Sequence, residues 1–329
     1  MKKACKWIKR IGLGLICLIT VLLLSGAAYQ FISSKIDENA YPPPGKLVDI
    51  GGYRLHINCT GEGGPAVILD SGLGGNSLEW TLVQPKLEKF TRVCSYDRAG
   101  QGWSDESPLA RTSQNIVHEL HTLLHKAEIP EPYILVGHSF GGINMRLYAS
   151  HYPNEVAGVV LVDSAHEDQL KKIPMTLPNK TVELFLGYIG YNRIRLLQYL
   201  PLIKETLKPF PNDVQEMYLT KISTTKFNRT ALEELFYLEE SLKQLKTAGG
   251  FLDDKPLIVI TAGKYPNSEE TGESQESLNK EDEILKALQK DLVTKSTKGK
   301  QIMAEQSGHM ITREQPEIIV EAIREVIGK

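Results

Sequence analysis

The sequence predicts an α/β fold in which a mostly parallel sheet carries helices on both faces. Short runs rich in Val, Ile and Leu alternate with segments of helical spacing, a pattern typical of strands that are buried on both faces. Residues 167–254 break this alternation with helical segments only. An uncharged apolar run over residues 11–32 precedes the α/β pattern, and its 22 residues are enough for one membrane-spanning helix.

The expected elements follow from local pattern. We expect an antiparallel strand pair at residues 47–50 and 53–59, which flank Gly51-Gly52. Apolar runs such as AVILD, YILV and VAGVVLV predict further strands, and spacing near 3.6 predicts the helices between them. These strands are expected at 66–70, 92–96, 133–136, 156–162, 257–261 and 299–305, and helices at 112–127, 140–151, 283–292 and 316–327.

The division of the chain follows from these elements. Residues 167–254 are too long and too apolar for a loop, so we expect a helical cap over one end of the sheet. We expect the polar stretch 264–282 to form a solvated loop. We therefore expect the following parts: a basic flank at 1–10, the apolar segment at 11–32, a Pro-rich linker at 33–46, a core formed by 47–166 and 255–329, and the cap at 167–254.

Charge is distributed unevenly along the chain. The 38 basic and 40 acidic residues give a net charge of −2, but five basic residues and no acid lie within residues 1–10. The remaining 33 basic and 40 acidic residues give −7, which argues against nucleic acid as a partner. Because basic residues stay on the cytoplasmic side, we expect the body outside the cell membrane on a single-pass anchor. The alternative is a signal segment cleaved near the small residues 25–28, which would release a secreted protein.

The sequence Gly137-His138-Ser139-Phe140-Gly141 lies between an expected strand and an expected helix. This is the context of the G-x-S-x-G elbow, in which a serine stands on a sharp turn above the carboxyl end of the sheet. Ser139 is therefore the candidate nucleophile. The backbone N–H of Phe140 is one expected oxyanion donor, and the N–H of Leu73, in the glycine-rich loop after residues 66–70, is the other.

A serine nucleophile needs a base and an orienting acid. His309, on a loop after the last expected strand, is the candidate base. Asp163, at the carboxyl end of the 156–162 strand, is the preferred acid, with Glu269, Glu270, Glu167 and Asp168 as alternatives. Three further histidines, His118, His121 and His125, share one helix face. We interpret them as solvated surface residues rather than metal ligands, because no Cys, Asp or Glu lies at ligand spacing.

These motifs together resemble the α/β-hydrolase superfamily, and in particular its cap-bearing, lipase/esterase-like members. The resemblance covers residues 46–329 and is carried by DSGLGG at 70–75, SYDRAGQGWSD at 95–105, VGHSFGG at 136–142, LVDSAHE at 161–167 and SGHMI at 307–311. It implies an eight-stranded sheet with a cap after the sixth strand. Family members usually have the acid after the seventh strand, whereas this sequence resembles those whose acid follows the sixth. Asp97-Arg98 resembles a structural turn of the family, and we assign it no chemistry.

The family's strand order would place Cys59 near Cys94, which makes a disulfide a hypothesis, with two buried thiols as the alternative. A serine at the elbow disfavours the dehalogenase and epoxide-hydrolase reactions of the superfamily, which use a carboxylate nucleophile. We expect hydrolysis of a small-molecule ester-like substrate through an acyl-enzyme, with no metal or organic cofactor. Alternatives are a serine aminopeptidase, acyl transfer to an alcohol or amine, and a non-catalytic binding protein. Candidate pocket residues in the cap are Leu184, Phe185, Tyr188, Phe236 and Tyr237.

Overall fold

The computed structural model describes residues 2–265, 268–272 and 274–328. Eight strands form one sheet in the order β1-β2-β4-β3-β5-β6-β7-β8, and the six strands from β3 to β8 are parallel to their neighbours in this group. The predicted mostly parallel, eight-stranded α/β fold is thus confirmed. The strands span Lys46–Asp49 (β1), Arg54–Thr60 (β2), Ala66–Asp70 (β3), Val93–Tyr96 (β4), Tyr133–His138 (β5), Val156–Val162 (β6), Leu257–Ala262 (β7) and Gly299–Ala304 (β8).

Helices cover both faces of the sheet because strand side chains alternate between them. Within β3, Ala66 and Ile68 face one core cluster while Val67 and Leu69 face the other. The first cluster packs under α3 (Ser113–Lys126), α4 (Phe140–His151) and α10 (Leu238–Ala248), and the second under α14 (Pro316–Ile327). The remaining helices of the core are η1 (Ser77–Trp80), α2 (Gln84–Leu87), η2 (Pro153–Glu155), α11 (Ser268–Thr271), α12 (Gln275–Val293) and α13 (Ile311–Glu314).

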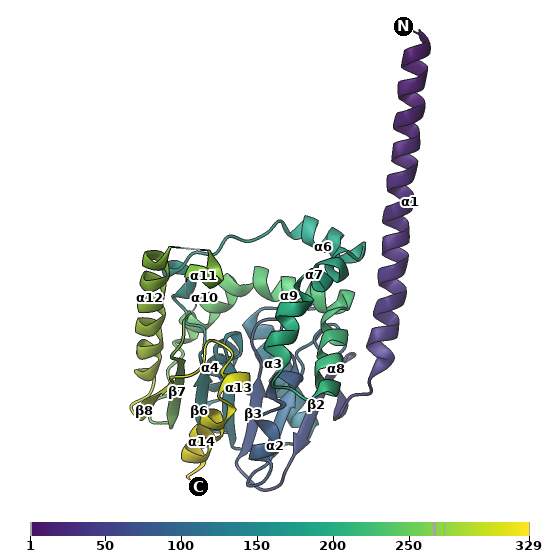
Figure 1. Cartoon of the computed structure of the whole chain (residues 1–329). Helices are drawn as coiled ribbons and strands as arrows, with labels where there is room; N and C mark the ends of the chain where they lie inside the picture. Colours follow the sequence, from purple (N-terminus) through teal and green to yellow (C-terminus); the bar gives the residue numbers. More distant parts are fainter. Residues whose placement is uncertain (1, 266–267, 273, 329) are drawn as a thin grey trace.

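The chain between β6 and β7 is helical and lies over the carboxyl end of the sheet (Figure 1). Its helices are α5 (Gln169–Lys172), α6 (Lys180–Tyr188), α7 (Tyr191–Leu207), α8 (Asn212–Ile222), α9 (Thr225–Phe236) and α10. The helix α12 begins at Gln275, so the polar stretch that we predicted as a loop is partly helical. Its first turn is capped by the Ser274 side chain, which accepts from the N–H of Ser277.

The N-terminal helix α1 (Lys2–Ala40) extends away from the body at its amino end (Figure 1). It is the one helix of the described chain that is long and apolar enough to cross a membrane. The predicted linker at 33–46 is mostly replaced by helix, because α1 continues to Ala40 and docks against the cap. There, buried Gln30 donates to the Ser223 carbonyl at 3.2 Å and accepts from the Arg193 guanidinium at 2.8 Å.

Cys59 and Cys94 form a disulfide. They lie directly opposite each other on the antiparallel strands β2 and β4, and their Cα atoms are 4.0 Å apart. The strand order that the resemblance implied is therefore present. The structure contains the hypothesised disulfide and not the alternative of two free thiols. Cys5 and Cys17 on α1 are unpaired and exposed.

Candidate active site

Ser139 occupies a sharp turn between β5 and α4. Its backbone has φ 51° and ψ −118°, a region that non-glycine residues rarely adopt and that persists only when its surroundings hold it. Two backbone hydrogen bonds do so. The N–H of Ser139 donates to the Val162 carbonyl at 3.1 Å, and the Ser139 carbonyl accepts from Ala165 at 3.0 Å. The end of β6 thus holds the nucleophile candidate in its strained conformation.

The glycines of the motif are required by close packing around this turn. A Cβ at Gly137 would overlap the backbone of Gly141, and a Cβ at Gly141 would overlap the carbonyl oxygens of Asp70 and Ser71. A Cβ at Gly142 would overlap the side chain of Ser164. The turn can therefore form only where these three side chains are absent, which accounts physically for the local sequence.

His309 and Asp163 are in direct contact. The Nδ1 atom of His309 lies 2.6 Å from Oδ2 of Asp163, while Oδ1 of Asp163 accepts the N–H of Ala262 at 3.1 Å. Asp163 immediately follows β6 and also has a positive φ, 40°. Because the carboxylate holds the proton on Nδ1, it leaves Nε2 of His309 as the free base nitrogen.

The alternative acids have other partners. Glu167 forms an ion pair with the buried Arg146 guanidinium at 2.6 Å and with Lys295 at 3.2 Å. Burial alone would raise the pKa of Glu167, but Arg146 lowers it well below its usual range. Asp168 pairs with Lys246 at 2.7 Å. The side chains of Glu269 and Glu270 lie outside the described residues.

A second histidine supports the first. The buried His138 Nε2 donates to the His309 carbonyl at 2.9 Å, and its Nδ1 lies 2.7 Å from the carboxylate of buried Glu79. The two ring nitrogens of His138 thus each face an oxygen atom, one of a carbonyl and one of a carboxylate. Burial alone would lower the pKa of His138, but the Glu79 carboxylate raises it above its ordinary value. His138 is the variable residue of the elbow motif, and no sequence signal identifies Glu79 as its partner.

The glycine-rich loop after β3 lies beside the elbow. A Cβ at Gly72 would come within 3.5 Å of the Ser139 Cβ, so the two backbones approach closely. Partly buried Leu73 follows Gly72, and Phe140 is the first residue of α4, whose N–H has no acceptor within the helix. Both expected oxyanion donors therefore belong to segments that adjoin Ser139.

Arg98 holds this loop and connects it to the cap. Its buried guanidinium donates to the carbonyls of Ser71 and Gly72 at 2.8 and 2.6 Å and pairs with Asp70 and Glu234. Glu234, on the cap helix α9, also accepts the N–H of Gly74 at 2.8 Å. We had assigned Arg98 no chemistry. It touches no reacting atom, but it positions the candidate oxyanion loop, and no sequence pattern identifies Glu234 as its partner.

One cavity of about 450 Å³ contains the three candidate residues Ser139, His309 and Asp163. The five cap residues predicted to line the pocket do not contribute to it, within the part of the chain that the structure describes. Its walls come mainly from the end of β6, from the segment after β7 and from α12, which packs on β7 and β8. They include Ala165, Gln169, Tyr265, Leu278, Glu281, Asp282 and Leu285.

The comparisons with known proteins agree with this architecture. A family model described as the alpha/beta hydrolase fold matches residues 65–280. The chain belongs to this family. A solved structure of the epoxide hydrolase CorEH shares the fold at a TM-score of 0.63, with 17% identity over 86% of this chain and 97% of the other. A thermophilic esterase from Thermogutta terrifontis shares it at 0.58, with 18% identity over 86% and 97%.

One relative found by sequence similarity is named as a transporter and not as a hydrolase. The probable transporter efuK of Hormonema carpetanum is 26% identical over 301 residues, which cover 85% of this chain and 42% of that protein. The present chain thus spans less than half of that relative's length. Proteins with different names thus resemble this chain, and only the geometry of the site can indicate its reaction.

Proposed function

We propose that this protein is a serine hydrolase that cleaves an ester-like bond through an acyl-enzyme. The observation that carries the proposal is the 2.6 Å contact between His309 and Asp163 in the cavity that also contains Ser139 on its strained turn. A nucleophile, a base and an orienting acid in one cavity are the parts that acyl transfer needs.

In the proposed reaction, Ser139 Oγ attacks the substrate carbonyl carbon while Nε2 of His309 takes the hydroxyl proton. The N–H groups of Phe140 and Leu73 stabilise the negative charge on the carbonyl oxygen. The bond to the leaving alcohol breaks as His309 returns the proton to its oxygen. Water then attacks the acyl-enzyme, again with His309 as base, and releases the acid and free Ser139. Asp163 keeps its charge and stabilises the imidazolium in both steps.

A serine aminopeptidase is the second candidate, and one observation favours it. Glu281 and Asp282 of α12 line the cavity, and a carboxylate there could hold the ammonium group of a substrate. Asp282 is already paired with Lys286 at 2.7 Å, which leaves Glu281 as the better candidate. We rank ester hydrolysis first because the cavity also carries Tyr265, Leu278 and Leu285.

A fluorophosphonate probe and a substrate panel test the proposal. We expect the probe to label folded protein at Ser139 and not the Ser139→Ala variant. Absence of labelling in the folded protein would favour the non-catalytic alternative. p-Nitrophenyl esters of increasing chain length, run beside amino-acid p-nitroanilides, then decide between esterase and aminopeptidase. Product analysis in the presence of an added alcohol or amine detects acyl transfer to acceptors other than water.

We further propose that α1 anchors the enzyme in the cell membrane, with the body on the outer side. The apolar run 11–32 within α1, the five basic residues before this run and the docking of the second half of α1 on the cap support this arrangement. Secretion after cleavage near residues 25–28 is the alternative. N-terminal sequencing of the native protein, with flotation of membranes from the producing cells, distinguishes the two.

A further inference from the structure

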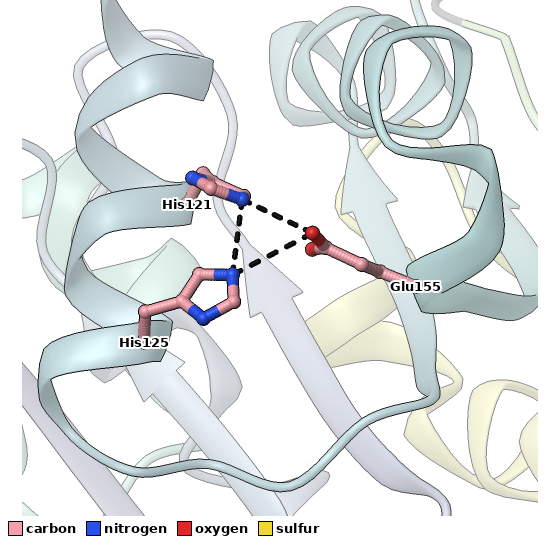
Figure 2. A group of neighbouring side chains, drawn as sticks. All are labelled: His121, His125 and Glu155. Carbon is pink, nitrogen blue, oxygen red and sulfur yellow. Dashed lines mark hydrogen bonds and ion pairs between the residues drawn. The ribbon is translucent and has the colours of Figure 1, made fainter.

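A cluster of two histidines and one glutamate lies outside the catalytic cavity. His121 and His125 are one turn apart on α3, and Glu155 is the last residue of η2, between α4 and β6 (Figure 2). The Nε2 atoms of the two histidines are 3.0 Å apart. Oε1 of Glu155 lies 3.0 Å from Nε2 of His121 and 3.5 Å from Nε2 of His125. Three potential ligand atoms therefore converge on one point.

The triangle that these atoms form has the size of a zinc coordination face. Bonds of about 2.0–2.1 Å in a tetrahedral site place neighbouring ligand atoms roughly 3.3–3.4 Å apart. The three observed separations, 3.0, 3.0 and 3.5 Å, are close to this value. A second carboxylate, Glu131, lies 3.7 Å from Nε2 of His125.

The surroundings orient two of the three residues. The ring of His121 stacks on Tyr152 with centroids 3.8 Å apart and planes 10° from parallel. The hydroxyl of Tyr148 donates to Oε2 of Glu155 at 2.5 Å, which leaves Oε1 directed at the histidines. Outer partners of this kind fix the geometry of metal ligands and contribute to affinity.

We propose that His121, His125 and Glu155 form a binding site for a divalent transition-metal ion, with zinc as the best match. Two imidazoles and a carboxylate favour Zn²⁺ over Mg²⁺ or Ca²⁺, which prefer oxygen ligands alone. The ion would join α3 to the turn after α4. Because none of the three residues lines the cavity of Ser139, the site stabilises the fold and takes no part in hydrolysis. Glu155 is distant along the chain from the helix that carries both histidines, so helical spacing does not relate it to them.

Zinc binding to the untagged full-length protein in detergent tests this site. After removal of metals with chelator, we expect about one zinc ion per chain by equilibrium dialysis and elemental analysis, with a melting temperature that rises with zinc concentration. His125→Ala and Glu155→Gln should each lower the affinity by about 100-fold or more, since each removes a ligand. His118→Ala is the matched control, because His118 is exposed on the same helix and lies outside the cluster.

The result has two readings. Loss of binding in the His125 and Glu155 variants, with normal binding by His118→Ala, supports the site. Failure of the wild-type protein to bind zinc, or equal binding by all variants, overturns it. Equal binding would place the ion elsewhere, for example on Cys5 or Cys17, and a Cys5→Ser/Cys17→Ser variant identifies that case. Circular dichroism of each variant verifies that it is folded.

A second inference concerns the cap and rests on the proposed membrane anchor. The helix α1 contacts the cap from Gly26 onward, where a Cβ would overlap the Ile189 carbonyl and where Gly190 also lies close. The apolar residues before this point, 11–25, are fifteen residues and span about 22 Å. The long side chains of Lys9 and Arg10 can reach the cytoplasmic surface while their backbone lies deeper. The part of α1 within the membrane thereby gains about one turn and measures roughly 28 Å. A hydrocarbon layer of about 30 Å therefore reaches the level of Gly26.

The cap exposes many large apolar side chains at this level. Helices α6 and α7 flank the turn at Ile189 and Gly190, and they lie beside α1 on the side of the body toward which its free end extends (Figure 1). The large side chains that α6 and α7 expose are Val182, Phe185, Tyr188, Tyr191, Ile194, Leu197, Tyr199 and Leu202. The aromatic residues among them are of a kind that is enriched where membrane meets water.

The geometry points to a lipid bilayer as the partner of this surface. We infer that α6 and α7 rest in the outer interfacial layer of the membrane that α1 spans, since their connecting turn is held against α1 where the hydrocarbon ends. The contact of Arg193 with Gln30 and Asp37 of α1, at 2.8 and 2.5 Å, keeps the cap at this height.

Site-specific fluorescence tests the inference. The full chain, carrying Cys5→Ser and Cys17→Ser, is labelled with a polarity-sensitive dye at Ile194→Cys or Leu197→Cys and reconstituted into phosphatidylcholine/phosphatidylglycerol vesicles. Leu109→Cys, exposed on the core, is the matched control. We expect blue-shifted emission and quenching by doxyl-labelled lipids at positions 194 and 197, and neither effect at position 109.

Other outcomes contradict the inference in distinguishable ways. If the protein floats with the vesicles but positions 194 and 197 emit as position 109 does, the anchor stands and the cap proposal fails. A blue shift without lipid quenching shows that a second protein copy covers the surface. Failure to float with vesicles removes the anchor and the cap proposal together, while the hydrolase proposal, tested by fluorophosphonate, is unaffected.

Discussion

The imidazole of His138 donates a hydrogen bond to the main-chain carbonyl of His309 at 2.9 Å. The residue before the candidate nucleophile thereby holds the backbone of the candidate base. Nδ1 of His138 also lies 2.7 Å from the Glu79 carboxylate, so a buried acid, its histidine and the His309 loop form one connected unit. The elbow therefore presents Ser139 and also helps to position the histidine that is expected to activate it.

Replacement of Glu79 by Gln tests this unit through stability. The pKa of Glu79 is held below 4.5 by His138, although burial alone would raise it, and the pKa of His138 is held above 6.5. The pair's contribution to stability is therefore lost as pH falls through the lowered pKa of Glu79. It is also lost as pH rises through the raised pKa of His138. We expect the difference in melting temperature between wild type and Glu79→Gln to be largest near pH ~5.5 and smaller at pH ~9.

The same variant should affect catalysis through His309. We expect kcat to fall by about 10- to 100-fold with little change in KM, because the base is misplaced while the cavity walls are intact. Glu62→Gln, which removes an exposed carboxylate, is the control. A melting difference that is constant with pH, together with unchanged kcat, would show that the pair is only a packing feature.

Asp163→Asn tests the choice of acid. Asparagine keeps the shape of the side chain but cannot stabilise the imidazolium, so kcat should fall by about 10⁴-fold with the fold preserved. Glu167→Gln, the matched variant of an alternative acid, should lose stability through Arg146 and retain its pH–rate profile. The assignment is wrong if Asp163→Asn retains substantial activity and Glu167→Gln, or a variant of Glu269 or Glu270, does not.

Glu234→Gln tests the connection between the cap and the oxyanion loop. It leaves the buried Arg98 with one carboxylate partner, Asp70, in place of two. We expect a loss of about 3 kcal/mol in the free energy of unfolding, because breaking a buried ion pair leaves charge uncompensated. We also expect kcat to fall by at least about tenfold as the loop at Leu73 shifts. Urea unfolding and steady-state kinetics measure both effects. Glu233→Gln, one residue earlier on the same helix, should show neither.

Removal of the disulfide should destabilise the protein without touching the site. Cys59 and Cys94 are separated by 35 residues, and closing a loop of this length contributes roughly 3–4 kcal/mol through the entropy of the unfolded chain. The double variant Cys59→Ala/Cys94→Ala should unfold at lower urea concentration and keep its kcat at 25 °C. Unchanged stability on reduction of the wild-type protein would contradict this expectation.

Local pattern in the sequence determined the fold class and identified Ser139 and His309 as candidate site residues. The spacing of apolar residues along the chain predicts which segments are strands and which are helices. The elbow around Ser139 requires glycines close to it in the sequence. His309 could be found because it lies on the loop after the last strand, where the motif places it. The apolar length of residues 11–32 was equally visible, but not that the helix continues to Ala40 and docks on the cap.

Tertiary structure decided the remaining features, because they join residues that no local period relates. Asp163 and His309 are 146 positions apart, and Arg98 and Glu234 are 136 apart. Glu79 meets His138, and Glu155 meets His121, only after the sheet has brought separate segments together. Helical or strand spacing specifies which face a side chain occupies, whereas the partner across that face depends on how the whole chain packs.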